Sequence, residues 1–335
     1  MKQLLTYSMI SSFMSCRKRY DYRYRQEIIP AQPVTALTFG SAVHLALQHY
    51  FEDLNEKKRM FSQFYGEVAA SYVGLDTEDS IKAKVLMEKY VQHYETSDHE
   101  RFYVEAVEKE FSLPLISPAG RKSGLFVIAG KVDGLIRNKA DGKLYILEHK
   151  TTSICDDGYI SRILIDTQIG IYAEALSRIM GEEIVGAVYD ILIKPAIRMK
   201  SGETDEEFEA RKAELLAKSK TGKTSAKKRE AETEEEFVTR LRESVNSGNF
   251  RREIVVFDKV KQDALKAEIW AVAHDIRSCR CFYKNTGNCN RYGICPYMDL
   301  CRANGNMTGL DELYKRQNAH SELSEDLTSS FKQIF

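Results

Sequence analysis

Apolar and polar residues alternate most clearly along residues 130–152, which read GKVDGLIRNKADGKLYILEHKTT. A polar stretch at 138–143 interrupts the pattern and contains the pair Asp141-Gly142, a strong signal for a tight turn. The apolar positions on its two sides are Val132, Leu135, Ile136, Leu144, Ile146 and Leu147. The pattern predicts two strands joined as a β-hairpin.

The periodicity of the rest of the chain predicts helices mixed with further strands. Strands are expected at 104–115, 126–136, 184–194 and 251–257. Helices are expected near the start of 4–27, then at 39–61, within 61–100, at 163–180 and at 259–277. The first of these helices has Ser8, Ser11 or Ser12 as its cap. This mixture indicates the α/β class.

Residues 195–250 differ from the rest because they are rich in charge and contain an internal similarity. ETDEEFEAR at 203–211 matches ETEEEFVTR at 232–240, and each begins with a threonine cap followed by acidic residues. We expect two amphipathic helices flanking the loop SKTGKTSAKKR at 219–229. Its GKT lacks the upstream glycine and strand of a phosphate-binding loop. A basic loop that touches DNA, a solvated loop and a disordered insert are all compatible with this composition.

Composition limits the function only weakly. The chain has 335 residues, 43% of them hydrophobic, which suffices for a substantial core. Its 49 basic and 49 acidic residues cancel, so any DNA-binding surface must be local. No apolar run reaches the roughly 20 residues of a membrane helix, and the N-terminus has no signal-peptide pattern. We expect a cytoplasmic protein without a membrane partner.

The charged residues of the predicted hairpin point to chemistry. A turn centred between Ala140 and Asp141 places Asp133 opposite Glu148, and a tight turn at Asp141-Gly142 shifts this register by about two residues. Glu148 and Lys150 leave the same face of one strand. Two carboxylates held together suit a hard divalent cation, beside which a lysine can orient or deprotonate water. An exposed hairpin with a cross-strand salt bridge is the simpler alternative.

A basic and aromatic run at 17–25, RKRYDYRYR, contains the candidate DNA-binding residues Arg17, Arg19 and Tyr20. Alternating cations and rings suit phosphate contact combined with base stacking. The alternative is a helix end whose tyrosines fill the core while the arginines face water.

The chain has seven cysteines, an odd number that argues against a disulfide framework without secretory context. Five of them follow the spacing C-x-C-x7-C-x5-C-x5-C over 279–301. This spacing lacks the close pairs of structural zinc sites, although it does not exclude zinc, and thiolates so spread can hold an iron–sulfur cluster. Cys155 is expected to be an ordinary thiol.

Together with its neighbours, the trio Asp133, Glu148 and Lys150 resembles the signature of the PD-(D/E)XK nucleases, specifically their RecB-like exonuclease branch. FGSAVHLAL at 39–47 resembles the branch's first motif, and QIGIY at 168–172 resembles its Q-x-x-x-Y motif. The cysteines resemble the split set of the members that carry an iron–sulfur cluster. The motifs occur in family order from about residue 8 to 301, as in CRISPR-associated and AddB-type nuclease domains.

The resemblance implies a PD-(D/E)XK restriction-endonuclease-like core, a central mixed sheet flanked by helices, with a helical insert and an iron–sulfur staple. It implies that Mg²⁺ or Mn²⁺ is held by His44, Asp133, Glu148 and the backbone carbonyl of His149, with Lys150 helping the attacking water. It further implies that Gln168 and Tyr172 grip DNA near the scissile phosphate.

For the cluster, the resemblance selects Cys16, Cys289, Cys295 and Cys301 as ligands of a 4Fe-4S group. Cys279 or Cys281 could replace one of the four. Such a cluster would join the two ends of the chain around the nuclease core; a redox role is the alternative.

The implied function is metal-dependent exonucleolytic hydrolysis of DNA from free or single-stranded ends. It would take place in a bacterial cell or phage-infected host, in recombination, repair or CRISPR adaptation, with a helicase or recombination protein as a partner. The alternatives are a non-catalytic module that binds DNA ends or a helicase, and a zinc-stabilised interaction protein. We expect a nuclease core with the first cluster ligand at 1–194, the insert at 195–250, a core strand, helix and cysteine segment at 251–310, and a polar tail at 311–335.

Overall fold

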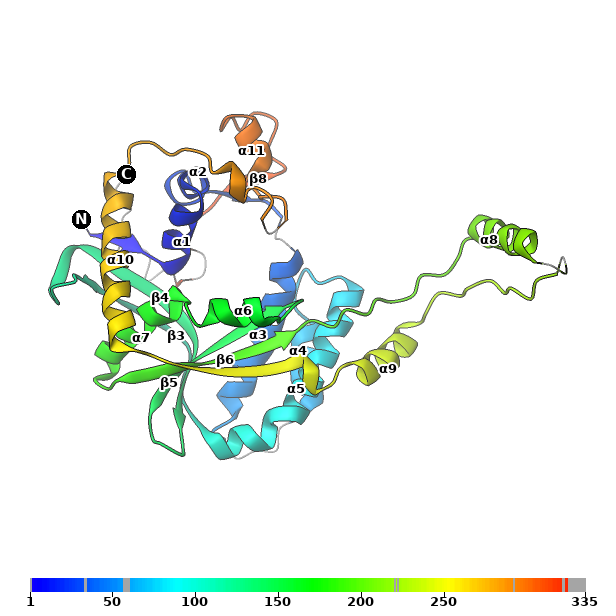
Figure 1. Ribbon diagram of the computed structural model, residues 1–335, viewed down its shortest axis with the longest axis horizontal. Coiled ribbons are helices and arrows are strands. Elements are labelled where there is room, and N and C mark those ends of the chain that lie inside the picture. Colours follow the sequence, from blue (N-terminus) through cyan, green and yellow to red (C-terminus); the bar gives the residue numbers. More distant parts are fainter. Residues whose placement is uncertain are drawn as a thin grey trace.

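A six-stranded mixed sheet forms the centre of the molecule in the computed structural model (Figure 1). The structure describes residues 2–32, 35–56, 61–219, 221, 223–291, 293–320 and 323–324, with the side chains of 35–37 left out. The strands of this sheet are β1 (Gln3–Leu5), β3 (Phe102–Ile116), β4 (Lys122–Asn138), β5 (Leu144–Thr152), β6 (Ile184–Ile193) and β7 (Phe250–Val256). Their order is β1-β4-β5-β6-β7, and β3 also pairs with β4. The β1–β4 and β5–β6 pairs are parallel, and the other pairs are antiparallel.

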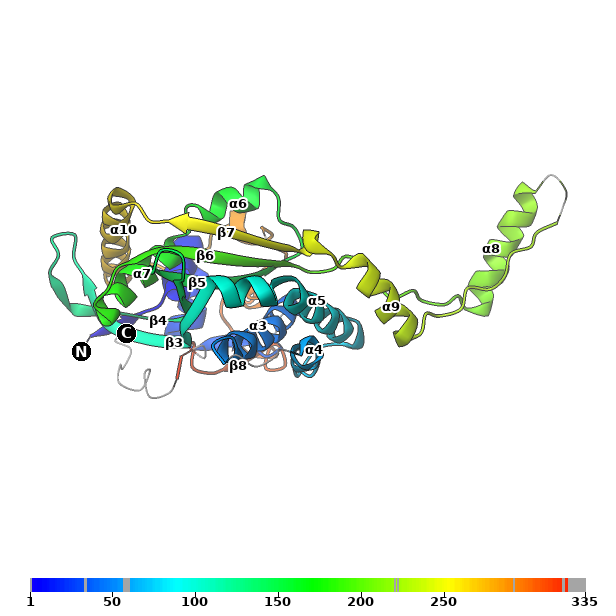
Figure 2. The ribbon, with the colours of Figure 1, turned by 90° about the horizontal axis from the view of Figure 1, so that it is seen from below.

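Helices pack on both faces of the sheet and create two apolar cores. One core lies among the sheet, α1 (Tyr7–Ser15), α7 (Thr167–Met180) and α10 (Lys259–Ser278). The other lies among the sheet, α3 (Thr35–Asp53), α4 (Ser62–Ala70) and α5 (Thr77–Arg101), which Figure 2 shows below β6 and β7. The expected mixed sheet flanked by helices is confirmed.

The predicted hairpin is formed by β4 and β5. Gly134 pairs with Leu147 and Leu135 with Ile146, which is the register of a turn centred between positions 140 and 141. Continuing this register by one residue places Asp133 opposite Glu148. The hairpin therefore brings the two acidic side chains to adjacent strands.

Several element boundaries differ from the prediction. The helix expected at 163–180 is α7 and begins only at Thr167, because the Asp166 side chain caps it by accepting from the Gln168 N–H. Helix α6 (Asp157–Ile163), just before it, was not predicted. Thr6 caps α1 instead of one of the serines. The helix expected over 39–61 ends at Asp53. Strand β1 was not predicted, because three residues are too few for a visible alternation.

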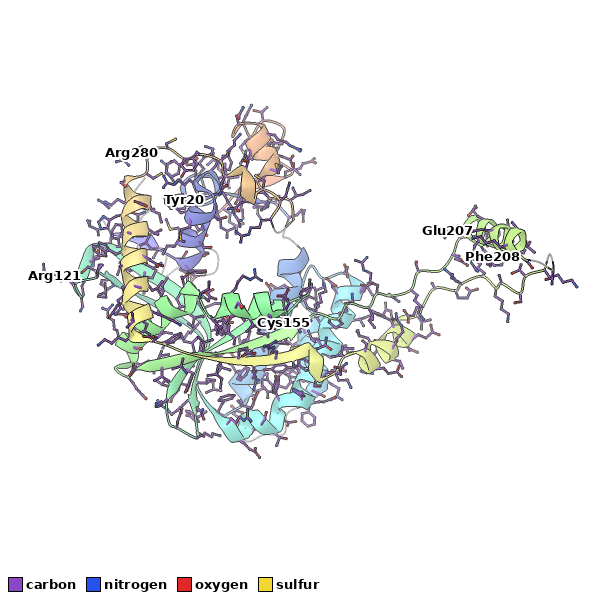
Figure 3. All side chains as sticks on the ribbon, viewed as in Figure 1. Tyr20, Arg121, Cys155, Glu207, Phe208 and Arg280 are labelled. Atoms are coloured by element: carbon purple, nitrogen blue, oxygen red, sulfur yellow. The ribbon has the colours of Figure 1, made fainter. Side chains whose placement is uncertain are left out.

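The insert forms an arm that projects from the body and carries α8 (Asp205–Lys218) at its end and α9 (Glu234–Ser244) near its base (Figure 1). Both predicted helices and both threonine caps are confirmed, each with a complete capping box. Phe237 and Leu241 of α9 are buried in the core that includes α5. Helix α8 has no buried residue, and Phe208 lies on it far from the body (Figure 3). Lys220 and Gly222 of the loop lie outside the described residues.

A separate two-stranded sheet joins a segment from the N-terminal part of the chain to one from the C-terminal part. Strand β2 (Ile28–Pro30) pairs antiparallel with β8 (Tyr314–Arg316), which lies within the expected polar tail. The remaining elements are α2 (Arg17–Tyr20), a π-helix (Asp21–Arg25), 3₁₀ turns (Ser247–Asn249 and Thr286–Asn288) and α11 (Met298–Arg302). Of the terminus expected at 323–335, only 323 and 324 belong to the described residues. In the described part of the chain, the helices are too short or too polar to cross a membrane.

Candidate active site

Glu148 and Lys150 are in direct contact at the centre of the candidate site. The Lys150 Nζ lies 2.5 Å from Glu148 Oε1, and the Glu148 side chain is only 5% exposed. The strand places both side chains on one face of β5, as predicted. Asp133 on β4 accepts a hydrogen bond from the backbone N–H of His149, with 2.8 Å between Oδ2 and N. The end of the hairpin therefore gathers two carboxylates and one ammonium.

His44 reaches this group from helix α3. Its Nδ1 lies 3.6 Å from Asp133 Oδ1, and its side chain is 32% exposed. The structure thus brings together His44, Asp133, Glu148 and Lys150, which come from one helix and two strands.

The two carboxylates differ in their affinity for protons. Burial and the charge of Asp133 raise the pKa of Glu148 to about 7, although Lys150 opposes this shift. Burial also acts to raise the pKa of Asp133, but the charge and hydrogen bond of His44 outweigh it and hold that pKa well below its ordinary value. Burial lowers the pKa of His44, and Asp133 reverses this shift to a net increase. Of the two carboxylates, only Glu148 resists ionisation in these surroundings.

Lys150 stays protonated in this environment. Burial disfavours the ammonium, but the charge and hydrogen bond of Glu148, followed by the charge of Asp166, raise the pKa of Lys150 above its ordinary value. At neutral pH the side chain is a hydrogen-bond donor and a positive charge. The resemblance left open whether this lysine orients or deprotonates water, and the raised pKa favours orientation.

The donor chemistry of the site fits a hard divalent cation. Carboxylate oxygens and an imidazole nitrogen are ligands that Mg²⁺ and Mn²⁺ accept, and positive charge would offset the burial and the repulsion by Asp133 that raise the pKa of Glu148. Within the described residues, however, no three His, Cys, Asp or Glu side chains converge as one metal-ligand group. The arrangement supplies suitable donors without the closed geometry of a complete site.

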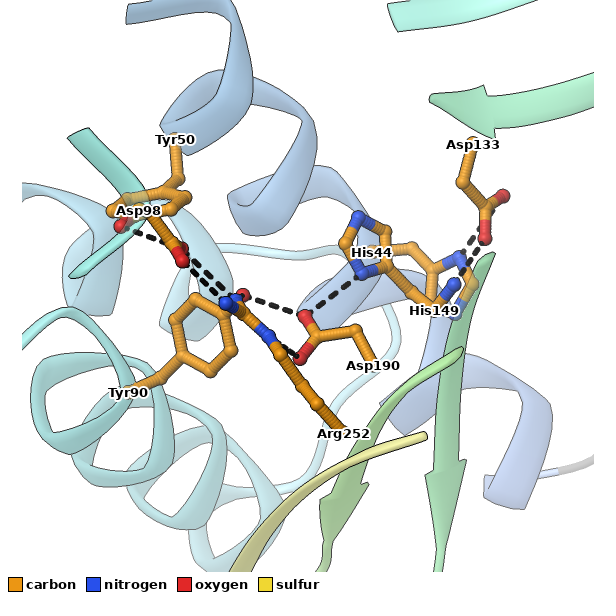
Figure 4. Close-up of polar contacts among 8 residues, drawn as sticks. All are labelled: His44, Tyr50, Tyr90, Asp98, Asp133, His149, Asp190 and Arg252. Atoms are coloured by element: carbon orange, nitrogen blue, oxygen red, sulfur yellow. Dashed lines mark hydrogen bonds and ion pairs between the residues drawn. The ribbon is translucent and has the colours of Figure 1, made fainter. Parts of the chain in front are cut away.

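The His149 side chain belongs to a buried polar network (Figure 4), on the face of β5 opposite Glu148 by the alternation of the strand. Its Nδ1 lies 3.1 Å from Asp190 Oδ2, and Asp190 accepts from Arg252 Nε at 2.8 Å and from the Tyr90 hydroxyl at 2.5 Å. Burial acts to raise the pKa of Asp190, but Arg252 and His149 bring it below its ordinary value. This network was not predicted, although an aspartate inside the apolar strand IVGAVYDILI is a visible signal of it.

Gln168 and Tyr172 lie one turn apart on α7. The Tyr172 ring is 6% exposed and packs edge-on against Phe111, with ring centres 5.0 Å apart. The alternative of a ring packed on the sheet thus describes Tyr172. Asp166, just before α7, was not predicted; its charge acts on Glu148 and Lys150, and the Tyr189 hydroxyl bonds to it.

In the basic and aromatic run at 17–25, the candidate tyrosine is buried, whereas the candidate arginines lie nearer the surface. Tyr20 is 1% exposed and lies between Phe13 and Phe282, so its ring is not available for stacking on a base. The prediction that Tyr20 contacts DNA therefore disagrees with its position in the core. Arg19 is exposed, and Arg17 lies over the Phe13 and Tyr283 rings.

The four candidate cluster cysteines lie around Asn285 and α11. Asn285 donates its backbone N–H to Cys16 Sγ at 3.4 Å, and its carbonyl accepts from Cys289 Sγ at 3.9 Å. Burial raises the pKa of Cys301, and the charges of Cys295 and Cys16 act in the same direction. The structure thus brings residue 16 to the C-terminal segment.

The other cysteines have different neighbours. Cys279 Sγ accepts from the Arg17 guanidinium at 3.8 Å, Cys281 is exposed, and Cys155 lies near Arg251.

Comparisons with known proteins agree with this geometry at the level of the family. A family model described as PD-(D/E)XK nuclease superfamily matches residues 4–302. No curated protein matches the chain. Among solved structures, the chain is similar to one titled "Crystal structure of SSO0001", with 13% identity, a TM-score of 0.32, and coverage of 79% of this chain and 84% of that chain. That TM-score is too low to support an argument.

Proposed function

The chain belongs to the PD-(D/E)XK nuclease superfamily, and on this premise we propose that it is a metal-dependent DNA exonuclease. Members of the superfamily are generally hydrolytic nucleases that use divalent metals such as Mg²⁺. The observation that carries the proposal is the placement of Asp133 and Glu148 on the two adjacent strands of the hairpin, with Lys150 2.5 Å from Glu148 and His44 3.6 Å from Asp133.

In this proposal, Asp133, Glu148 and His44 hold Mg²⁺ or Mn²⁺, together with the backbone carbonyl of His149. The bound cation supplies positive charge that polarises the scissile phosphate and activates water. Asp133 is ready for this role at neutral pH, because its pKa lies far below its ordinary value. Glu148 has a pKa of about 7 and must lose its proton before it can ligate.

Lys150 acts as a fixed ammonium rather than a base. Its contact with Glu148 directs the side chain toward the site, where it donates a hydrogen bond to the attacking water or to a phosphate oxygen. Because the side chain is 28% exposed, it can reach a substrate from its present position.

For the substrate we propose DNA with a free or single-stranded end, in phage or bacterial recombination, repair or CRISPR adaptation. Gln168 lies at the start of α7, next to Asp166, whose charge acts on Glu148. This neighbourhood supports a role for Gln168 in binding the substrate strand, and exposed Arg19 is a further candidate contact.

We also propose a 4Fe-4S cluster on Cys16, Cys289, Cys295 and Cys301. The contacts that Asn285 makes with Cys16 and Cys289 support this set. Thiolates are the ligands of such clusters, and these four would join the N-terminal and C-terminal segments. Cys279 fits the set less well, because its sulfur bonds to Arg17.

The test is digestion of DNA labelled at one end, single-stranded or double-stranded and linear or circular, by anaerobically purified protein. Parallel reactions contain Mg²⁺, Mn²⁺ or EDTA, and Lys150→Ala protein serves as the matched control. We expect metal-dependent loss of linear DNA with the wild type alone, and the label gives the direction of digestion. If the protein binds these DNAs and leaves every form intact, the alternative of a non-catalytic DNA-end or helicase-binding module replaces the nuclease.

A further inference from the structure

We propose that Asp190 is a positioning residue that acts through His149 to hold His44 and Asp133 in place for the metal. This inference rests on the proposed function, because it concerns the same candidate metal site. It assigns a role to side chains on the buried side of β5, opposite Glu148 and Lys150.

His149 contacts both of the side chains that it would position. Its backbone N–H donates to Asp133 Oδ2 at 2.8 Å. Its ring supports the His44 ring edge-to-face, with centres 5.8 Å apart and planes at 83°. On its other side, the His149 ring packs against Phe51, with ring centres 5.2 Å apart. A rotation of the imidazole would therefore disturb His44 directly and Asp133 through the backbone.

Asp190 is the polar partner that fixes this imidazole. It is the direct neighbour of His149 in the parallel β5–β6 register and is fully buried. Its Oδ2 lies 3.1 Å from His149 Nδ1. A carboxylate at one ring nitrogen fixes both the tautomer and the rotation of a histidine. Asp190 thus determines which edge of the ring faces His44.

Asp190 is itself held from two other elements. Arg252 of β7 donates to Asp190 Oδ1 at 2.8 Å, and Tyr90 of α5 donates to Oδ2 at 2.5 Å. The Arg252 guanidinium also contacts both oxygens of buried Asp98. With these donors in place, Asp190 has little freedom to turn away from His149.

The network returns to the helix that carries His44. The Tyr50 hydroxyl donates to Asp98 Oδ2 at 3.1 Å, and Tyr50 follows His44 by six residues on α3. The series of contacts therefore begins and ends on α3. It runs from His44 through His149, Asp190, Arg252 and Asp98 to Tyr50. Such a ring of contacts fixes the helix relative to the hairpin, which sets the distance between His44 and Asp133.

Stability alone does not account for this arrangement. Replacing buried ion pairs by apolar residues is often neutral or stabilising, so burial of these charges is weak evidence for a purely structural role. Removal of an outer-shell partner that orients metal ligands typically weakens metal binding or activity by about 10-fold to 100-fold, and Asp190 would act on the ligands His44 and Asp133 through His149. The two roles make different predictions for metal affinity.

The experiment measures Mn²⁺ binding to metal-free protein by isothermal titration calorimetry, and DNA cleavage as a function of Mn²⁺ concentration. We expect Asp190→Asn to weaken Mn²⁺ binding about 10-fold or more. The matched control is Glu88→Gln, which removes another buried carboxylate of the α3–α5 core, one that pairs with Arg242 and does not contact His149. Its Mn²⁺ affinity should stay within about 2-fold of wild type, and equal losses in the two variants would overturn the inference.

A double-mutant cycle tests the route of the effect. His149→Phe keeps an aromatic ring and the backbone but removes the nitrogen that contacts Asp190. If Asp190 acts through His149, Asp190→Asn costs little further Mn²⁺ affinity in the His149→Phe background. The same loss in both backgrounds would refute the proposed route.

Two outcomes separate this inference from the proposed function. If the wild type binds Mn²⁺ and cuts DNA while Asp190→Asn behaves like Glu88→Gln, only the inference fails. If the wild type neither binds Mn²⁺ nor cuts DNA, both fail. Should Asp190→Asn not fold, His149→Phe alone must show the weakened Mn²⁺ binding, and unchanged binding overturns the inference.

Discussion

Asp133 accepts a hydrogen bond from the backbone N–H of His149, 2.8 Å away on the neighbouring strand. This contact lies where the regular β4–β5 pairing ends, one residue beyond the pair Gly134 and Leu147. A side-chain carboxylate takes the place of a main-chain acceptor, so its orientation is set by the backbone of the strand that carries Glu148 and Lys150. The geometry of the candidate site depends on strand pairing as much as on side-chain packing.

Lys150→Ala should reduce DNA cleavage by about 10²-fold to 10³-fold, the cost typical of losing one charged donor at a developing negative charge. Mn²⁺ binding should persist, because the ammonium is not a ligand in the proposed site. Gel assays of cleavage and calorimetry of Mn²⁺ binding provide the measurement. Lys143→Ala, at an exposed position of the hairpin turn, is the control and should cut DNA normally.

Glu148 should make the stability of metal-free protein depend on pH. Its folded pKa of about 7 exceeds the ordinary value of 4.5, so the folded state binds more protons between these values. The stabilisation is fully present below pH 4.5 and is lost as the pH rises through about 7.

Glu148→Gln should remove this loss, so that the free energy of unfolding of the variant relative to wild type rises by about 2–3 kcal/mol between low and neutral pH. Urea unfolding in EDTA at several pH values measures it. Exposed Glu183→Gln is the control, and parallel pH curves for wild type and Glu148→Gln would contradict the assignment.

Gly130→Ala should destabilise the fold without touching the charged residues. A β-carbon at this position would lie 2.8 Å from the Tyr172 ring, which overpacks the contact and costs about 1–3 kcal/mol. Gly124→Ala is the matched change on the same strand, where a β-carbon meets nothing within 4 Å. Urea unfolding should show that Gly130→Ala is less stable than Gly124→Ala. Equal stabilities would show that Tyr172 can move aside.

The cysteines make a separate prediction. Anaerobically purified Cys16→Ser and Cys289→Ser proteins should lose bound iron and the visible absorbance of the cluster, since each removes one thiolate ligand. Cys155→Ser should retain both, because that sulfur lies near Arg251 rather than near Asn285. Iron retained in every variant would exclude the proposed ligand set.

The repeated helices of the insert offer a matched pair of core and surface residues. Phe237→Ala in α9 should cost about 3–5 kcal/mol of unfolding free energy, because the ring is fully buried against the core that includes α5. The corresponding Phe208→Ala in α8 should change stability by less than about 0.5 kcal/mol, since that helix has no buried residue. Urea unfolding of both variants is the measurement; a large cost at Phe208 would mean that α8 is covered.

The sequence reveals the hairpin because two local signals agree there. Alternation indicates the strands, and the polar stretch at 138–143 indicates a turn between them. Of the two registers left open, the structure has the one centred between positions 140 and 141 rather than the one centred on Asp141-Gly142. The capped helices of the insert are visible for the same reason, since Thr204 and Thr233 with their acidic neighbours act locally.

Features that depend on distant packing are not visible in this way. Arg252 lies in the segment RREIVV, where charge suggests exposure, yet its side chain is only 12% exposed because two aspartates from other elements surround it. Tyr20 alternates with arginines as a DNA-contacting residue would, but Phe13 and Phe282 enclose its ring. Local pattern determines the strands and caps, and tertiary contacts determine which charged and aromatic side chains become buried.

The position of Arg252 in the chain has a consequence for biosynthesis. Asp98 and Asp190 precede it, and the whole arm at 195–250 is synthesised in between. On the ribosome, helix α5 with Asp98 and strand β6 with Asp190 therefore emerge before the guanidinium that the two carboxylates share. Burying them at that stage carries a desolvation cost that the Arg252 guanidinium cannot yet offset. The nascent nuclease core becomes fully folded only after β7 has left the exit tunnel, however early the hairpin itself has formed.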